Sequence, residues 1–576
     1  MLLGYDFEVF KYNWLVVFID PFKHTVTCIW DNQQQLEQFH KDHCDMIYCG
    51  YHSRFYDEPV MQAILCGFDA WKINEWLVKM HLPGYKFSKE LNKIKIINYD
   101  TQPSADKSLK QLEAFQGHNI KESDIDFNID RPLTEAEKRE VEKYCINDVM
   151  ETLSIFSKTK EDFNALLSLI KMFQLPFSNI SKTKAQNIAK ILECVYVARS
   201  DTWDLYTLPC LNIGKYQNCV EWFFDKKNQW YKDKNGNENP GFNTVIAGVM
   251  HSLGFGGIHG AVTRFNYKCK PGEMLIHVDV ESYYPSLMIE WNLLTRNAQK
   301  SERYKYIKDL RLKLKHEGKK KEQAPLKIVI NGTFGICNDP KSAAYDPRNA
   351  NLITINGQLL LIDLIDKLEA VDSFQLIQSN TDGLIIKIKE QDFEAVDDIC
   401  YEWETRTHMK LGFDYITKIY QGDVNNYLFQ YETGEWERKG AYVKELSELD
   451  NDLPIVNKAI CDYLMYGIPV EETVNNCTDY VMFQKVVKLT GKYTDVEHNG
   501  KLVKHKCNRV FASADFWDKA IYKIKENGRK EKFACTPDNC YIDNSDIRYT
   551  PIPDKLNKKW YINLAKDRLL KKFGVN

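Results

Sequence analysis

The sequence predicts an α/β protein built from several domains. Its 576 residues are enough for about four domains at roughly 150 residues each. Two strand-like apolar runs, Leu2–Phe10 and Trp14–Ile19, precede helical stretches such as 135–157, which follows the helix-start signal RPLTEAE. Hydrophobic residues make up 44% and aromatic residues 13% of the chain, so packed cores are expected and disorder is excluded as the main state.

The charge balance excludes a strongly basic protein. Lysine and arginine total 77 against 80 acidic residues, a net charge of −3, so any nucleic-acid binding must come from local patches. The N-terminal run carries acids, and no uncharged apolar run approaches the length of a membrane span. The 16 cysteines are scattered without paired CxxC motifs. We therefore expect a soluble cytoplasmic protein with reduced thiols and no membrane contact.

The rest of the chain follows in distinct segments. Residues 176–270 mix helix with a glycine-dense stretch, SLGFGGIHG, whose backbone can approach another group closely. MLIHVDV then predicts a strand, a basic helix is expected from about 297 to 316, and a second helix is expected to start at Pro325. Two apolar strands around 380–383 predict a hairpin. The last segment is lysine-rich and ends in the amphipathic helix INLAKDRLLKKF.

Acids near the N-terminus have the spacing of a metal site. Asp6 and Glu8 stand two residues apart on a predicted strand, so both carboxylates project from one face. Asp57 and Asp148 would complete a group of four, and Tyr144 lies one helical turn before Asp148. Divalent cations take oxygen ligands of this kind. Taken alone, the pair Asp6 and Glu8 is explained more simply as a solvated edge or a partner for lysine, and Asp57 and Asp148 as ordinary helix or loop acids.

A second pair of acids lies on apolar strands. Asp279 ends the strand MLIHV, where a charge costs several kcal/mol unless it is paired or metal-bound. Asp382 precedes Gly383, and an Asp-Gly pair between apolar strands is a strong hairpin signal, so a turn alone would explain it. If the hairpin pairs beside the Asp279 strand, both carboxylates can share metal ions and support displacement at phosphorus.

Basic helices provide a possible partner for such a site. Residues 300–321 contain ten lysines or arginines against three acids, although a charge run is usually a solvated face. One stripe of this helix is cationic and consists of Lys308, Arg311 and Lys315. In the next helix a cation, an amide and an aromatic ring share one face, at Lys327, Asn331 and Phe334. Such a face can contact a triphosphate, a sugar and a base.

Taken together, these segments resemble a family B DNA polymerase with a 3′→5′ exonuclease domain. The family's motif D-x-x-S-L-Y-P-S matches 279–286, K-x-x-x-N-S-x-Y-G matches 327–335, and Y-x-D-T-D-S matches 378–383. The three exonuclease motifs match Asp6 with Glu8, the segment ending at Asp57, and Tyr144 with Asp148. The compact size and the GGIHG stretch make the chain similar to bacteriophage members, including the protein-primed ones.

The resemblance implies an architecture of an RNase H-like exonuclease domain followed by a right-hand polymerase. The expected boundaries are 1–175 for the exonuclease domain, 176–270 for a connecting region, 271–295 and 359–430 for the palm, 296–358 for the fingers, and 431–576 for the thumb and C-terminal region. The implied function is addition of deoxynucleotides to a primer 3′ end, with proofreading, in replication of a phage genome. Implied partners are primer–template DNA, dNTPs and phage replication proteins, and the chain is expected to be a monomer.

The resemblance also implies residue roles in the polymerase. Asp279 and Asp382 would bind two magnesium ions, for which manganese can substitute. Lys327, with Arg311 and Lys315, would hold the triphosphate. Tyr284 would lie under the sugar and exclude a 2′-hydroxyl. Asn331 and Phe334 would pack near the new base pair. Residues implied to contact DNA are Tyr427, Lys439, Gly256 and Gly257.

In the exonuclease, four carboxylates are implied to hold two metal ions, and these are Asp6, Glu8, Asp57 and Asp148. Tyr144 would orient the attacking water. The sequence departs from the family pattern at His52, where the exonuclease motif has asparagine. In the polymerase motifs, Asn380 replaces an acid, Gly332 and Gly383 replace serines, and Phe334 replaces a tyrosine. We expect activity to survive Asn380, with an altered metal preference.

Two spacings favour an ordinary nucleic-acid primer. Lys327 follows Asp279 by 48 residues and Asp382 follows Gly335 by 47, which leaves little room for the insertions of protein-primed relatives. Two alternatives to the full enzyme stay open. One is a polymerase-shaped chain that acts only as a nuclease, for which Asn380 and the glycine replacements argue. The other is a non-catalytic replication scaffold that binds primer–template DNA.

Overall fold

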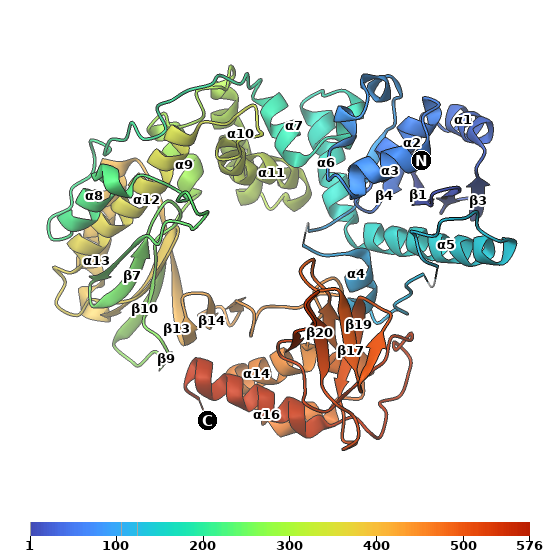
Figure 1. Ribbon diagram of the computed structural model, residues 1–576. Helices are drawn as coiled ribbons and strands as arrows, with labels where there is room; N and C mark the ends of the chain where they lie inside the picture. The colour runs from blue at the N-terminus through green and yellow to red at the C-terminus, as the bar shows by residue number, and fades with distance from the viewer. Residues whose placement is uncertain (1, 105, 124, 576) are drawn as a thin grey trace. The chain divides into compact units, whose positions relative to one another are not determined.

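The chain folds into two compact units of mixed α/β structure, in a computed structural model that describes residues 2–104, 106–123 and 125–575 (Figure 1). The first unit, called unit 1, consists of Met1–Lys182, Leu446–Val456 and Glu471–Asn563. The second, unit 2, consists of Thr183–Glu445, Asn457–Val470 and Leu564–Asn576. The α/β, multidomain character expected from the sequence is therefore confirmed. The functional names of the predicted domains stay predictions.

Unit 1 begins with a five-stranded sheet in the order β3-β2-β1-β4-β5. The strands are β1 (Leu2–Val9), β2 (Trp14–Asp20), β3 (Thr25–Trp30), β4 (Ile47–Gly50) and β5 (Asn98–Asp100). The central strand β1 runs antiparallel to β2 and parallel to β4. The first two predicted strands are confirmed to within one residue at their ends. Because β1 is central, its side chains are buried from both faces, and only Asp6 is partly exposed.

The helices that follow are α1 (Gln33–Asp42), α2 (Asp57–Leu65), α3 (Ala70–Val78), α4 (Leu109–Phe115), α5 (Glu135–Lys158) and α6 (Lys160–Met172). The helix predicted at 135–157 is confirmed as α5. It begins where a capping box forms: the Thr134 hydroxyl accepts the Glu137 N–H, and the Glu137 carboxylate accepts the Thr134 N–H. Val141, Cys145 and Val149 on its buried face pack in one core with residues of β2, which fixes α5 against the sheet.

The C-terminal part of unit 1 is mainly β-structure. One small sheet contains β16 (Lys485–Lys488), β19 (Cys507–Ala512) and β22 (Cys540–Ile542). The other contains β17 (Asp495–His498), β18 (Lys501–Val503), β20 (Ile521–Ile524) and β21 (Lys530–Lys532). Arg509 on β19 is fully buried, and Nη2 donates to the carbonyls of Ala114 (3.0 Å) and His118 (2.8 Å). Residues 471–563, predicted within the thumb, thus share unit 1 with the N-terminal sheet.

Unit 2 is organised around a ten-stranded sheet, with the main order β15-β14-β13-β10-β12-β11-β8-β7-β6 and β9 paired to β13. Its strands are β6 (Phe242–Ile246), β7 (Val249–Leu253), β8 (His259–Ala261), β9 (Phe265–Lys268), β10 (Glu273–Val280), β11 (Gln375–Asn380), β12 (Gly383–Lys389), β13 (Leu411–Asp423), β14 (Asn426–Tyr431) and β15 (Trp436–Lys439). The predicted MLIHVDV strand is β10, and it lies between β12 and β13, antiparallel to both.

The helices of unit 2 include α7 (Lys184–Ile191), α8 (Gln217–Phe224), α9 (Tyr283–Glu290), α10 (Ser301–His316), α11 (Lys320–Cys337), α12 (Pro347–Leu368) and α13 (Phe393–Thr407). Three further helices cross the boundary between the units: α14 (Pro454–Tyr466) lies mostly in unit 2, α15 (Val470–Asn476) mostly in unit 1, and α16 (Lys558–Arg568) in both. Helix α12 is buried on all sides over most of its length, as expected for a central helix. In the described part of the chain, no helix combines the length and apolar character that crossing a bilayer requires.

The prediction that the second basic-segment helix starts at Pro325 is wrong. Helix α11 begins at Lys320, so Pro325 stands in its second turn. A proline there removes one backbone hydrogen bond, but its side chain is fully buried and contributes packing in return. Helix α10 ends at His316 as predicted and begins at Ser301, about one turn later than expected.

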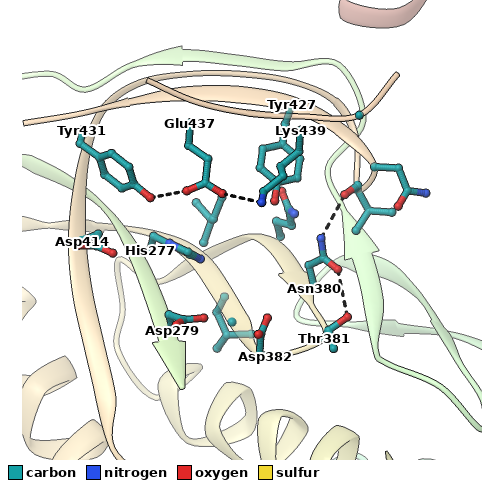
Figure 2. A pocket seen from close by; sticks show the side chains of 17 residues that line it. His277, Asp279, Asn380, Thr381, Asp382, Asp414, Tyr427, Tyr431, Glu437 and Lys439 are labelled. Carbon is teal, nitrogen blue, oxygen red and sulfur yellow. Dashed lines mark hydrogen bonds and ion pairs between the residues drawn. The ribbon is translucent and has the colours of Figure 1, made fainter. Parts of the chain in front are cut away.

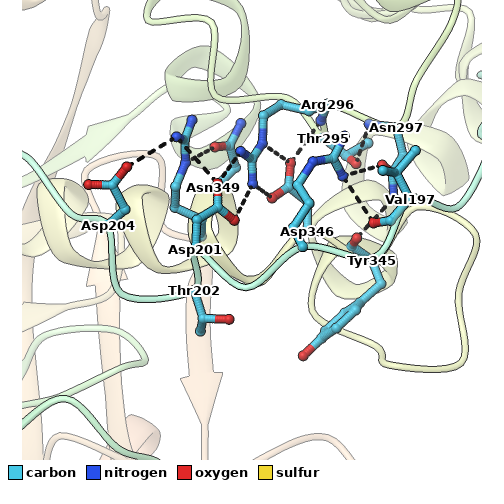
Figure 3. A network of polar contacts seen from close by, with 12 residues as sticks. Val197, Asp201, Thr202, Asp204, Thr295, Arg296, Asn297, Tyr345, Asp346 and Asn349 are labelled. Atoms are coloured by element: carbon cyan, nitrogen blue, oxygen red, sulfur yellow. Dashed lines mark hydrogen bonds and ion pairs between the residues drawn. The ribbon is translucent and has the colours of Figure 1, made fainter.

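A polar network holds together the two chain segments that enter α10 and leave α11 (Figure 3). Arg296 donates to the buried carboxylate of Asp346 through Nε (2.9 Å) and Nη2 (2.6 Å), and to Asp201 through Nη1 (2.5 Å) and Nη2 (3.1 Å). Asn297 Nδ2 donates to the Tyr345 carbonyl at 2.9 Å. Arg296, which forms ion pairs with both Asp346 and Asp201, therefore anchors the α10–α11 pair.

Candidate active sites

The four acids predicted to form a metal site in unit 1 are brought together. Asp6 and Glu8 lie on one face of β1, and their ligand atoms and Cys145 Sγ all lie within 4.8 Å of one another. Asp57, at the first residue of α2, accepts the Phe7 N–H at 2.9 Å and so lies against the same strand. Asp148 comes from α5. Glu8, Asp57 and Asp148 are 8%, 2% and 6% exposed.

The pKa values of all four carboxyl groups are raised, chiefly by burial. Burial raises the pKa of Asp57 to about 8. Burial, followed by the charges on Asp57, Glu8 and Asp148, holds the pKa of Asp6 well above its usual range. The pKa values of Glu8 and Asp148 are raised chiefly by burial as well. Four crowded acids with raised pKa values are a donor set that a divalent cation fits, because the ion supplies the missing positive charge.

A lysine that the sequence reasoning missed stands inside this cluster. Lys110 Nζ donates to Asp148 Oδ1 at 2.5 Å and to Glu113 Oε1 at 3.1 Å, and it lies 4.6 Å from the centre of the Tyr144 ring. Its charge opposes the effect of burial on the pKa of Asp148. A capping box between Ser108 and Gln111 marks the start of α4, so the helix could have been found from the sequence. The contact with Asp148, 38 residues away, could not.

Tyr144 lies where the sequence predicted it, one turn before Asp148 on α5. Burial, and then the charge on Asp148, hold the pKa of its hydroxyl well above the usual range, so the hydroxyl stays a proton donor. His52, which replaces an asparagine of the motif, is exposed, and its Nδ1 is 3.0 Å from Gln102 Oε1.

In unit 2 a pocket of about 730 Å³ opens over the centre of the sheet (Figure 2). The structure places Asp279 and Asp382 in its floor and Tyr427 and Lys439 in its wall, so four of the predicted residues line one cavity. Asn380 lines it too, and its Nδ2 is 3.4 Å from the Val424 carbonyl. Tyr427 and Lys439 are paired across β14 and β15, which explains why both reach the same pocket.

Asp382 stands in the predicted hairpin, but the turn is made differently from the prediction. Asn380 and Gly383 are the closing pair of β11 and β12, so Thr381 and Asp382 form the loop. Thr381, rather than the glycine, has the left-handed backbone, with φ of +57°. A hydrogen bond from the Val280 N–H to the Asp382 carbonyl (2.8 Å) holds the loop against β10. Asp382 is therefore a turn residue that also lines the pocket.

Gly383 stands where space is tight, and its backbone is not one that needs glycine. A Cβ there would lie 3.0 Å from the Val278 carbonyl oxygen, 3.2 Å from His277 Nε2 and 3.3 Å from Asp279 Oδ1. On the other side of Asp279, the paired residue is Gly412, where a Cβ would meet only ordinary contact at 3.8 Å. Asp279 therefore has a glycine on both neighbouring strands, which keeps its carboxylate accessible from the pocket.

The pKa values of two acids in this pocket, Asp279 and Asp382, are also raised. Burial raises the pKa of Asp279 to about 7, with further contributions from the charges on Asp382, Asp414 and Glu437. Burial raises the pKa of Asp382 as well. The buried Oε1 of Gln378, another lining residue, has no hydrogen-bond partner among the described residues. Carboxyl groups with raised pKa values beside an unpaired amide oxygen fit a hard divalent cation.

Three further lining residues were missed by the sequence reasoning. His277 stands two residues before Asp279 on β10 and faces the same pocket, a relationship that the period of a strand could have indicated. Burial lowers its pKa. Glu437 accepts the Tyr431 hydroxyl at 2.6 Å and pairs with Lys439 at 3.5 Å (Figure 2). Asp414 pairs with His277 across β10 and β13.

The predicted nucleotide-contacting residues on α10 and α11 lie outside this pocket lining, as far as the described residues show. Lys327 and Asn331 are exposed on α11. The ring of Phe334 lies 4.7 Å from that of Tyr284 on α9. On α10, Arg311 Nη1 is 3.5 Å from Ser282 Oγ, and the charge of Lys315 lowers the pKa of Asp279. Lys315 is thus within electrostatic reach of the pocket.

The two glycines predicted to contact DNA differ in their surroundings. At Gly257 a Cβ would lie 2.6 Å from Thr381 Oγ1, so close packing against the Asp382 hairpin already requires glycine. At Gly256 a Cβ would meet nothing within 4 Å, and the Gly256 carbonyl accepts from Gln358 Nε2 at 2.9 Å. Gln358 on α12 therefore fixes the path of the glycine-rich stretch.

Comparison with protein-family models and with curated proteins gives no match. Among solved structures, the chain is similar to the structure of the family B DNA polymerase from the hyperthermophilic archaeon Pyrobaculum calidifontis. The similarity covers 100% of this chain and 78% of that chain, with 13% sequence identity and a TM-score of 0.41. These values are too low to assign a function, so the functional argument rests on the two sites.

Proposed function

We propose that the chain is a DNA-directed DNA polymerase with a 3′→5′ proofreading exonuclease. The observation that carries the proposal is the pocket of unit 2, in which Asp279 and Asp382 from two sequence motifs lie beside Tyr427 and Lys439 from a third region. A second, separate group of four acids in unit 1 accounts for the exonuclease motifs. Two distinct carboxylate sites in two units match two reactions at phosphorus.

In unit 2, Asp279 and Asp382 would hold the divalent ions of the polymerase. When bound, magnesium would lower the pKa of the primer 3′-hydroxyl and neutralise phosphate charge. Lys327, Arg311 and Lys315 would bind the triphosphate through their charges. Tyr284, with its ring against Phe334, would support the sugar and leave no space for a 2′-hydroxyl. Asn331 and Phe334 would lie near the new base pair.

In unit 1, Asp6, Glu8, Asp57 and Asp148 would hold the ions of the exonuclease. Tyr144, whose raised pKa keeps its hydroxyl protonated, would donate a hydrogen bond that orients the attacking water. Lys110 would keep Asp148 in its charged form, because its ammonium group bonds the carboxylate directly. The active form of the site therefore depends on one lysine as well as on the four acids.

We further propose a nucleic-acid primer, primer–template DNA and dNTPs as substrates, and a role in phage genome replication. The intervals that hold insertions in protein-primed relatives are occupied here by α9 and α10 on one side and by α12 and β11 on the other. Extension from the hydroxyl of a terminal protein would contradict this assignment of the primer.

Primer extension on a labelled DNA primer–template tests the proposal. The chain is incubated with magnesium, with and without dNTPs, and the products are separated on a gel. The proposal expects longer products with dNTPs and shorter products without them. If repeated preparations give neither longer nor shorter products but still bind the duplex in a gel-shift experiment, the scaffold alternative would replace the proposal.

One observation favours a second candidate, a chain that acts as a nuclease only. Asn380 lines the pocket where the family motif has an acid, so the site has one negative charge fewer. Shortening without dNTPs, and no extension with magnesium or manganese, would support this candidate. Extension with either ion would exclude it.

A further inference from the structure

The loop 513–519, between β19 and β20 in unit 1, holds two large aromatic side chains in solvent. Phe516 is 75% exposed and Trp517 is 79% exposed. Their rings lie 5.9 Å apart at 77°, an edge-to-face pair that keeps both rings off the protein surface. Exposing two neighbouring aromatic rings to water is unfavourable. A bound partner that covers the rings would explain why they are exposed here.

Hydrogen bonds hold this loop in a fixed shape. Ser513 Oγ donates to Asp518 Oδ2 at 2.6 Å, and the Trp517 N–H donates to Asp515 Oδ1 at 2.9 Å. Two asparagines outside the loop hold its end: Asn539 Nδ2 donates to the Asp518 carbonyl at 2.7 Å, and Asn499 Oδ1 accepts the Lys519 N–H at 2.7 Å. The aromatic pair is therefore presented by a preorganised loop, which reduces the entropy lost on binding.

The surrounding segment is basic, in contrast to the chain as a whole. Apart from the buried Arg509, residues 485–532 contain twelve lysines or arginines against six acids, of which Asp515 and Asp518 lie in the loop, whereas the full chain has a net charge of −3. The Lys519 ammonium lies 5.1 Å from the centre of the Phe516 ring. Two further lysines near the loop are exposed: Lys555, whose carbonyl accepts the Ala514 N–H, and Lys501, two residues after Asn499. The charge of this region is complementary to a polyanion.

We infer that loop 513–519 is a stacking site for single-stranded nucleic acid, with Trp517 as the platform for one base and Lys519 as a phosphate contact. A stacking site needs an accessible aromatic face beside cations, and both are present. The occupant is single-stranded, since the bases of a duplex have no free face for an inserted ring.

A protein partner or a second copy of the chain is less well matched by these features. Protein interfaces are depleted of lysine at their centre, whereas Lys519 lies directly at the aromatic pair. The site lies outside both carboxylate clusters. The inference therefore goes beyond the proposed function and does not depend on it.

Cross-linking in EDTA tests the site without any catalytic activity. The full chain is mixed with a thymidine oligonucleotide that carries one 5-iododeoxyuridine, irradiated and digested, and the modified peptide is identified by mass spectrometry. The expected result is a cross-link within 513–519, which a fully paired duplex of the same sequence does not give. Cross-links confined to other peptides would overturn the inference.

Affinity measurements by fluorescence anisotropy in EDTA give an independent test. Trp517→Ala should weaken binding of the oligonucleotide roughly 5-fold to 100-fold, and Trp517→Tyr should retain most of it. Lys519→Gln should reduce the salt dependence of binding. The control is Phe22→Ala, which removes a ring that is also exposed, at 69%, in unit 1; it should leave the affinity unchanged.

Circular dichroism and sedimentation complete the test. The Trp517 ring is exposed, so its removal leaves no cavity and the Trp517→Ala chain should keep the wild-type melting curve. Unchanged affinity in a folded Trp517→Ala chain would overturn the inference, and a change in oligomeric state without a change in affinity would assign the loop to self-association. A cross-link at 513–519 in a chain that fails primer extension would keep this inference and defeat the proposed function.

Discussion

Asp279 on β10 pairs across the sheet with Gly383 on β12, the residue that follows Asp382. This register brings the two carboxylates of separate motifs to adjacent strands, although they are 103 residues apart in the sequence. The pairing also puts residue 383 within contact distance of the Asp279 carboxylate. The glycine that replaces the serine of the family motif is therefore part of how this site is built.

Replacing Gly383 by serine should damage the polymerase site. The new Cβ would lie 3.0 Å from the Val278 carbonyl and 3.3 Å from Asp279 Oδ1, so the neighbouring atoms must give by a few tenths of an ångström. Overpacking of this kind costs about 1–3 kcal/mol of unfolding free energy, and the extension rate should fall with it. The control is Gly412→Ala on the opposite side of Asp279, where the Cβ meets only an atom at 3.8 Å. Equal extension rates in the two variants would contradict this account.

The elements and many site residues could be predicted because their signals are local. The period of a strand puts Asp6 and Glu8 on one face of β1, and the capping box at Thr134 fixes the start of α5. The apolar strands around Asp382 predicted the hairpin. The apolar strand that ends at Asp279 predicted the position of this second acid, which lies beside the hairpin in the sheet. Each of these inferences used only residues that are close together in the sequence.

The features that could not be predicted depend on contacts between distant segments. Lys110 meets Asp148 across 38 residues, and Glu437 reaches the pocket only because β15 pairs with β14. The role of Gly383 depends on atoms of a neighbouring strand, so its local sequence indicated only a turn. Pro325 was misread for the opposite reason: burial of its ring outweighs the preference of proline for a helix start.

The two carboxylate sites should be separable by mutation. Asp279→Ala or Asp382→Ala should lower primer extension by at least about 100-fold, since loss even of an outer partner of a metal ligand costs 10- to 100-fold, while degradation of single-stranded DNA continues. Asp6→Ala should have the reverse effect. Both activities are measured on the same preparations, with circular dichroism as the test of folding. A folded single variant that lacks both activities would show that the sites are not independent.

Lys110 should control the pH dependence of the nuclease. Its ammonium group opposes the effect of burial on the pKa of Asp148 and of Glu8, so Lys110→Gln should raise both values further. The acidic limb of the activity profile should then move to higher pH, and activity at pH 7 should fall by about 10-fold or more.

Two comparisons make this result specific. Lys110→Arg, which keeps the charge, should restore part of the activity. Lys79→Gln, at the residue that follows α3, removes only exposed contacts with Glu75 and the Trp71 ring and should leave the profile unchanged. A profile that keeps its shape and position in Lys110→Gln would limit Lys110 to a structural role.

Arg296 should anchor the α10–α11 pair. Arg296→Ala leaves the fully buried Asp346 without its principal partner, which costs about 3–5 kcal/mol. Amide hydrogen exchange should accelerate across 301–337, since both ends of this segment are held by the same arginine. Lys319→Ala, which removes an exposed pair with Glu317, is the control and should leave exchange unchanged. Faster exchange in β10 and β12 but not in α10 or α11 would contradict the anchoring role.

Stability should fall as pH rises when divalent cations are removed. The pKa of Asp57 is raised to about 8 and that of Asp279 to about 7 in the folded chain, against about 3.9 for an unperturbed aspartate. The folded state therefore binds protons that the unfolded state releases, so this contribution is complete below about pH 4 and is lost as pH rises towards 8. Each carboxyl contributes a slope of at most about 1.4 kcal/mol per pH unit.

Urea denaturation in EDTA between pH 5 and pH 8 measures this slope, and added magnesium should restore stability most at pH 8, where the carboxylates are charged. Asp57→Asn cannot release a proton, so its slope should be smaller than that of the wild type. Asp130→Asn is the matched control, because a hydrogen bond from Lys11 lowers the pKa of this exposed acid and it stays ionised throughout the range. Stability that rises with pH in EDTA, or parallel curves for Asp57→Asn and the wild type, would contradict the raised pKa of the buried Asp57 carboxyl group.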